Sequence, residues 1–165
     1  MQHIFLVETN KKCKSDEHYI RALLNERYDY PGDKISFIYM ESKTKYDKVE
    51  SKVENLKNKY FGESKIYICI DLDEANNENI ILNNKIIQYS NKNKYNLIWF
   101  YENIEMVFWG KKISDKYKCE EAVKFRNKKE IKNTNFNKLS KIEMYKESRT
   151  SNIIEILDKE LKIKY

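Results

Sequence analysis

The sequence is poor in the residues that build tight turns and phosphate-binding loops. It has one proline and three glycines in 165 residues, and the glycines, Gly32, Gly62 and Gly110, lie far apart. No glycine-rich phosphate loop is present, which excludes a P-loop ATPase. The chain also lacks an apolar run near the length that crosses a bilayer, and residues 1–8 are too short and wrongly flanked for a signal peptide. We therefore expect a cytoplasmic protein that does not enter membranes.

Cysteine and histidine are scarce as well. The three cysteines, Cys13, Cys69 and Cys119, are odd in number and widely separated, and they form no Cys-x-x-Cys pair. A disulfide framework and a thiolate zinc site are both poorly supported, so reduced and structurally ordinary cysteines are expected. His3 and His18 are isolated in the sequence, and a lone histidine more often packs or faces solvent than catalyses.

Core-forming residues are plentiful in spite of these absences. Hydrophobic residues make up 41% of the chain and aromatic residues 13%, which argues for a folded protein. At this length one domain can bury a core without disulfides or a structural metal. We therefore expect a single domain over residues 1–165 with a very polar surface, because 35% of the residues are charged.

Positive charge is concentrated in the last third of the chain. The net charge is +6, and residues 101–165 hold 16 Lys plus Arg against 11 Asp plus Glu. Basic residues of this kind neutralise phosphates along a nucleic acid backbone, although a solvated lysine-rich face is an equally open interpretation. The candidates for nucleic acid binding are Lys111, Lys112, Lys116, Lys118 and Arg126.

Strand and helix patterns alternate along the chain. Apolar runs predict strands at 3–8, 35–40, 65–70 and 96–101. Apolar residues at helical spacing predict helices at 16–28 and 46–60 and, towards the C-terminus, at about 115–128, 136–146 and 150–161. Residues 76–90 fit a short helix or a loop, and residues 104–109 fit a short buried helix or a continuation of the preceding strand.

This alternation defines the expected fold class. Strands separated by helices predict an α/β protein whose mostly parallel sheet, of about four strands, is covered by helices on both faces. The C-terminal part is expected to be helical. No repeat, low-complexity tract or linker marks a second domain.

The apolar run from Ile66 to Ile70 ends in two aspartates that stand one residue apart, Asp71 and Asp73. Such a run is typical of a buried parallel strand. Because side chains alternate along an extended chain, both carboxylates are expected on one side, where they can face one cation.

Glu8 follows the first expected strand in the same way. Ligands of parallel sheets bind at the carboxyl ends of the strands, so Glu8, Asp71 and Asp73 converge if their strands are neighbours. Three acids that close repel one another unless a divalent cation lies among them or one of them keeps its proton. The sequence therefore predicts a Mg²⁺ site that also suits Mn²⁺. Taken singly, each acid is equally compatible with a helix N-cap or a solvated loop residue.

Several segments, in chain order, resemble one known family. Ile4–Glu8, Asp16–Leu24 and Ile68–Asp73 are similar to the Toprim domain of primases, topoisomerases and the nucleases of the OLD group. The signature of that domain is a glutamate after the first strand and Asp-x-Asp after the third. Asn103–Trp109 and Ser148–Ile154 resemble two segments of the small RloB-like branch.

The resemblance implies a Toprim-like fold and a metal-dependent, nuclease-like activity on nucleic acid phosphodiesters, in bacterial or phage defence. By matching position, Glu8 would be the general acid/base, and Asp71 and Asp73 would hold magnesium. Glu17, which opens the first helix, and Glu105 are further candidates by the same match. A partner ATPase or another defence protein fits this setting.

Two other functions stay open at this point. Asp71 fits the nucleophile of a haloacid-dehalogenase-type phosphatase, except that Ala75 stands where that motif has a hydroxyl residue. The chain also fits a non-catalytic module that binds nucleic acid or a partner protein on the same fold.

Overall fold

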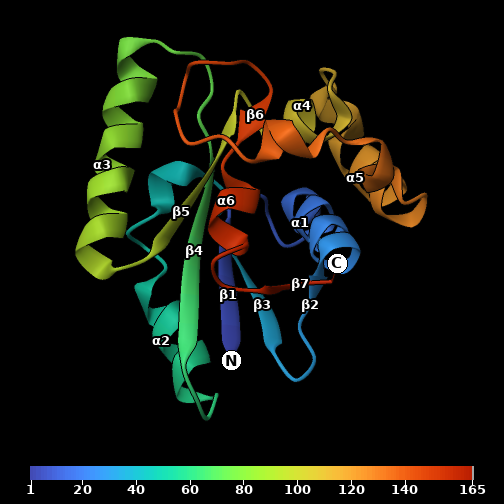
Figure 1. The fold of residues 1–165 in the computed structure, drawn as a ribbon. Coiled ribbons are helices and arrows are strands. Elements are labelled where there is room, and N and C mark those ends of the chain that lie inside the picture. The colour runs from blue at the N-terminus through green and yellow to red at the C-terminus, as the bar shows by residue number, and fades with distance from the viewer. Residues whose placement is uncertain (165) are drawn as a thin grey trace.

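The computed structural model describes residues 1–164 and shows an α/β fold built on a five-stranded sheet. The strand order is β3-β1-β4-β5-β6, in which the first four strands are parallel and β6 runs antiparallel to β5 at one edge (Figure 1). The strands are β1 (Gln2–Val7), β3 (Lys34–Tyr39), β4 (Ser64–Asp71), β5 (Asn96–Tyr101) and β6 (Thr150–Ser151). The predicted fold class is confirmed, with one strand more than expected.

The sheet is covered on both faces, as its apolar strands require. The helices are α1 (Ser15–Arg27), α2 (Glu50–Asn58), α3 (Asn77–Asn93), α4 (Ile104–Trp109), α5 (Lys118–Asn127) and α6 (Ile153–Leu157). Figure 1 shows α2 and α3 on one side of the sheet and α1, α4 and α5 on the other. Successive residues of β1 divide between two cores, because Phe5 packs with α1 and α5 whereas Ile4 and Leu6 pack with α2 and α3.

The helical pattern of the first two thirds of the chain is confirmed. In α1 the predicted core residues Tyr19, Ile20, Leu23 and Leu24 are fully buried. Residues 76–90, left open between helix and loop, belong to α3 except for its cap, and the Asn76 side chain caps the first turn by accepting the Asn79 N–H. Residues 104–109 are a helix with the same kind of cap.

The predicted helix at 136–146 is wrong. Only a 3₁₀ helix, Phe136–Leu139, forms there, and the chain then continues as a loop through residue 149. The apolar residues of this loop do not share one helical face, because Ile142 is 77% exposed while Met144 and Tyr145 pack against the core on the α2 and α3 side of the sheet. Tyr145 has a left-handed backbone with φ of 61°, and Glu147 pairs with Lys138 and Lys141.

The predicted helix at 150–161 is shorter than expected. Thr150 and Ser151 form β6, and the Asn152 side chain hydrogen-bonds the backbone of β5 before α6 begins. The chain ends on β7 (Lys162–Ile163), which pairs with β2 (Tyr28–Asp29) in a separate two-stranded sheet. Tertiary pairing with β5 and β2 overrides the local helical pattern at both ends of this segment.

The expectation of three reduced cysteines is wrong for two of them. Cys13, in the loop after β1, and Cys119, at the start of α5, form a disulfide with a Cα–Cα distance of 5.2 Å. The pair is 106 residues apart in sequence and comes together because α5 packs against α1. Cys69 is free and buried. Over residues 1–164, no helix is both long and apolar enough to cross a membrane.

We expect the double substitution Cys13→Ser and Cys119→Ser to lower the free energy of unfolding by about 2–4 kcal/mol, because a bond closing so long a loop restricts the unfolded chain. Denaturant titration followed by circular dichroism measures this change. A reductant should destabilise the wild type and leave the double variant unaffected. Three free thiols per chain in denatured, unreduced protein would contradict the prediction.

Candidate active site at the carboxyl edge of the sheet

The parallel strands bring their following loops to one edge of the sheet. In the strand register Val7 lies opposite Tyr39, and Asp71 lies opposite Phe100, so β1, β3, β4 and β5 end side by side. This is the edge at which parallel sheets bind ligands. A cavity of about 360 Å³ opens there. Its lining includes Glu8, Asp16, Glu41, Asp71, Glu105, Asp115 and Lys118, together with both cysteines of the disulfide.

Glu8 and Asp71 meet as the sequence predicted. A Glu8 carboxylate oxygen, Oε1, accepts the backbone N–H of Asp71 at 2.7 Å. Asp71 Oδ1 accepts the N–H of Ile104, at the start of α4, at 2.9 Å. Within residues 1–164, neither carboxylate forms a hydrogen bond through its second oxygen. Each side chain is thus oriented through one oxygen and has the other available to a ligand.

Asp16 joins this pair, and sequence reasoning missed it. Asp16 is the first residue of the helix predicted at 16–28, but it is 6% exposed, and its Oδ2 accepts the N–H of Glu8 at 3.1 Å. The loop between β1 and α1 therefore folds back on itself and brings the first turn of α1 beside the end of β1. The position of Asp16 directly after that loop is the only sequence signal that could have indicated its place beside Glu8.

Glu105, a candidate through the family resemblance, is placed in the cavity by α4. Asn103 caps this short helix by accepting the Met106 N–H, and Glu105 in its first turn is 2% exposed. Its Oε1 lies 3.9 Å from the Lys118 ammonium, and its Oε2 is buried without a hydrogen-bond partner among residues 1–164. A buried carboxylate oxygen without a partner is costly, so this oxygen is a candidate ligand atom.

Burial and mutual repulsion shift the protonation of these acids. Burial, followed by the charge of Asp16, raises the pKa of Glu8 from 4.5 to about 8. Burial, followed by the charge of Glu105, raises the pKa of Asp16 from 3.8 to about 7. Burial and the charge of Glu8 raise the pKa of Asp71 well above its usual value, and burial also raises the pKa of Glu105. All four carboxyl groups therefore lie in an environment that disfavours their ionised form unless a positive charge balances it.

Asp73 departs from the prediction. Strand β4 ends at Asp71, and Asp73 has a left-handed backbone with φ of 59°, so the expected alternation of side chains along an extended chain is wrong at this residue. Its carboxylate oxygen Oδ2 pairs with the ammonium of Lys43 at 2.5 Å. Asp73 does not line the cavity that Glu8 and Asp71 share.

The residues of the cavity suit a hard divalent cation. In residues 1–164, no three His, Cys, Asp or Glu side chains already stand at the spacing that holds a metal ion. The chemistry of the donors nevertheless fits Mg²⁺ or Mn²⁺, which bind carboxylate oxygens. Glu8 and Asp71 each have a second oxygen available, and Glu105 has a buried oxygen with no partner. Small rotations of these side chains would be needed to gather them on one ion.

The remaining predicted residues divide into three groups. Glu17 accepts hydrogen bonds from Arg21 and Tyr39, which outweigh burial and lower its pKa, so it is tied within the fold. Lys118 is half-buried at the cavity and pairs with Glu105 and Asp115. Lys111, Lys112 and Lys116 are exposed between α4 and α5, whereas Arg126 borders a different cavity beside α1.

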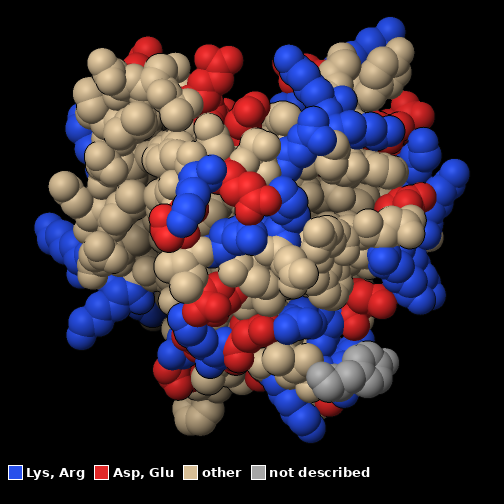
Figure 2. Space-filling model, turned by 45° about the horizontal axis from the view of Figure 1, so that its top comes forward, with Lys and Arg blue, Asp and Glu red and all other residues tan. Residues whose placement is uncertain are grey.

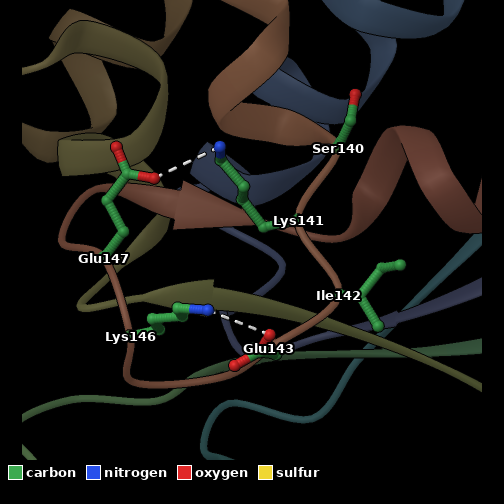
Figure 3. A pocket seen from close by; sticks show the side chains of 6 residues that line it. All are labelled: Ser140, Lys141, Ile142, Glu143, Lys146 and Glu147. Carbon is green, nitrogen blue, oxygen red and sulfur yellow. Dashed lines mark hydrogen bonds and ion pairs between the residues drawn. The ribbon is translucent and has the colours of Figure 1, made fainter.

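A second cavity, of about 500 Å³, lies in the loop after the 3₁₀ helix Phe136–Leu139 (Figure 3). Its charged side chains neutralise one another, because Lys141 pairs with Glu147 at 3.2 Å and Lys146 with Glu143 at 3.1 Å. Ile142 is mostly exposed there. Hydrogen bonds from Lys138 and Lys141 lower the pKa of Glu147 here, whereas burial raises the pKa of Glu8, Asp16 and Asp71 in the smaller cavity, so the cavity at the carboxyl edge is the candidate active site.

Comparison with protein-family models, with curated proteins and with solved structures finds no match to this chain. The candidate site is therefore argued from its own geometry.

We expect the free energy of unfolding of the metal-free protein to fall as pH rises from about 5 to about 8.5. The folded chain holds protons on Glu8 and Asp16 up to pH about 8 and about 7, whereas the unfolded chain releases them near 4, so raising the pH favours unfolding. The slope is at most about 1.4 kcal/mol per pH unit for each carboxyl.

Denaturant titrations in a chelator at several pH values measure this slope. The double substitution Glu8→Gln and Asp16→Asn should flatten it, and Glu63→Gln, an exposed acid at the opposite edge of the sheet, should not. Equal slopes in the wild type and the double variant would show that these two acids do not carry the effect.

Proposed function

We propose that this protein is a Mg²⁺-dependent nuclease-like enzyme that cleaves phosphodiester bonds of nucleic acid at the carboxyl edge of its sheet. The observation that carries the proposal is the convergence of Glu8, Asp16, Asp71 and Glu105 on one cavity, with an oxygen of Glu105 that has no hydrogen-bond partner in the described part of the chain. Acids gathered in this way, with raised pKa values, are typical of metal-dependent phosphate chemistry. The sequence resemblance to Toprim domains supports the same activity.

The carboxylates of the site would have different roles, which depend on their positions. Glu8 and Asp71, each oriented by a backbone N–H, would hold the cation through their second oxygens. When bound, the cation supplies charge stabilisation to the phosphate and orients the attacking group. Asp16 and Glu105 border the same space and would complete the set of carboxylates. Glu8 is also the candidate general acid/base, by its match to the family position.

The basic surface beside the cavity supports nucleic acid as the substrate. Figure 2 tips the top of the molecule in Figure 1 towards the viewer and shows Lys and Arg side chains interspersed with Asp and Glu side chains over this face. Lys111 and Lys116 lie over the rings of Trp109 and Tyr117, with their ammonium groups 5.0 and 5.4 Å from the ring centres. Ammonium groups presented in this way can neutralise phosphates on either side of the cleavage point.

The cleavage test uses plasmid DNA, single-stranded DNA and structured RNA, each with Mg²⁺, with Mn²⁺ or with a chelator. We expect cleavage of at least one substrate that depends on the metal, and a fall of about 100-fold or more in Asp71→Asn and Glu8→Gln. Glu63→Gln should cleave at the wild-type rate, because its side chain is exposed at the opposite edge.

Intact substrates in every condition would defeat the proposal. Two other functions would then be separable with the same variants. An aspartyl-phosphate analogue trapped on Asp71 would identify a phosphatase with an aspartate nucleophile. Metal-independent, salt-sensitive binding that survives Glu8→Gln and Asp73→Asn would identify a binding module for nucleic acid or a partner protein.

We expect the triple substitution of Lys111, Lys112 and Lys116 by glutamine to weaken nucleic acid binding in a chelator and to reduce the slope of log affinity against log salt by about 2–3. Fluorescence anisotropy at several salt concentrations measures both quantities. The matched control replaces Lys34, Lys59 and Lys162, which are exposed outside the carboxyl edge. Equal losses in the two triple variants would mean that binding is not localised beside the cavity.

A further inference from the structure

Lys43 is a buried lysine that sequence reasoning did not single out. It lies in the 3₁₀ helix Lys43–Lys45, directly after β3, and its side chain is only 7% exposed. Because β3 pairs in parallel with β1, this segment arrives at the same edge of the sheet as Glu8. The Ser42 side chain caps the turn by accepting the Thr44 N–H. The fold therefore places the positive charge of Lys43 in the interior, near the acid cluster, by which we mean Glu8, Asp16, Asp71 and Glu105.

The contacts of the Lys43 ammonium all lie on the segment that ends β4. It donates to the backbone carbonyl of Asp71 at 2.7 Å and to the carboxylate of Asp73 at 2.5 Å. An ammonium group has three donors and is costly to remove from water unless it is paired. Two donors are used here, and the third has no partner within residues 1–164.

The backbone around Asp73 fixes the position of its carboxylate beside the Lys43 ammonium. Its left-handed backbone turns the chain out of the strand direction, and its N–H donates to the carbonyl of Glu102, in the loop after β5, at 2.8 Å. Its carboxylate is 47% exposed, so water alone would suffice to solvate it. The pairing therefore balances charge at the acid cluster, where the positive charge of Lys43 also works against the burial that raises the pKa of Glu8.

We propose that the Lys43 ammonium is a built-in cation that occupies the Asp73 side of the site, so that the site takes one divalent cation, on the Glu8 and Asp71 side, and not two. The inference rests on the proposed function for the presence of that one ion. Lys43 is then a positioning residue. It holds Asp73 and the turn after β4, and its third donor can meet an oxygen of an incoming phosphate.

The experiment counts bound metal, with Mn²⁺ alone as the probe and electron paramagnetic resonance of free Mn²⁺ as the readout. We expect one Mn²⁺ per wild-type chain and two per Lys43→Met chain, because methionine keeps the apolar stem and removes the charge. Lys43→Arg should bind one. Lys43→Met combined with Asp73→Asn should also return to one, because the ligand for the second ion has gone.

Thermal unfolding provides a second readout if Lys43→Met is unstable. Mn²⁺ should then raise its melting temperature by more than it raises that of the wild type or of Lys43→Arg, because the metal replaces the missing charge. Two ions bound by the wild type, one ion with unchanged affinity in Lys43→Met, or a Lys43→Met chain that stays unfolded in Mn²⁺ would each overturn the inference.

The same measurements separate this inference from the proposed function. A wild type that binds one Mn²⁺ and gains a second in Lys43→Met, yet cleaves no nucleic acid, would defeat the nuclease proposal alone. A wild type that cleaves nucleic acid and binds two ions would defeat the role of Lys43 alone. A wild type that binds no Mn²⁺ would defeat both.

Discussion

Carboxylates gathered away from water repel one another, and this repulsion is the constraint around which the carboxyl edge of the sheet is arranged. Glu8, Asp16, Asp71 and Glu105 share one cavity, and each has its pKa raised. Such a cluster costs stability, because the folded chain must either hold protons or bear uncompensated charge. A fold keeps such a cluster where a ligand repays the cost, which is why the cluster, more than any single acid, points to a cation.

Two lysines and several backbone N–H groups around the cluster reduce this loss of stability. Lys43 approaches from the segment after β3 and pairs with Asp73, and Lys118 approaches from the start of α5 and lies beside Glu105. Backbone N–H groups of Asp71, Glu8 and Ile104 orient the carboxylates in between. The disulfide of Cys13 with Cys119 ties the loop that carries Glu8 to the helix that carries Lys118. The site is therefore framed by elements that are remote in sequence and held at fixed separations.

The sequence alone was a good guide wherever local pattern and burial agree. Apolar runs located β1, β3, β4 and β5 to within a residue or two, and the helical stripe of α1 was recovered in full. The meeting of Glu8 with Asp71 was predicted on the condition that their strands are neighbours, and the structure meets that condition by pairing β1 with β4. The pattern failed at 136–146, where spacing favoured a helix but Tyr145 has a left-handed backbone and packs with Met144 against the core while Ile142 stays exposed.

By itself, then, the sequence determined the class of fold, the parallel strands and the edge of the sheet at which Glu8 and Asp71 lie, because these follow from the order of apolar runs and helical stripes along the chain. Only the tertiary structure decided that Asp16 joins them, that Asp73 turns away to Lys43, and that Cys13 bonds with Cys119. The physical reason is that each of these contacts joins groups whose proximity depends on how loops fold back and helices pack. No local period along the chain encodes those distances.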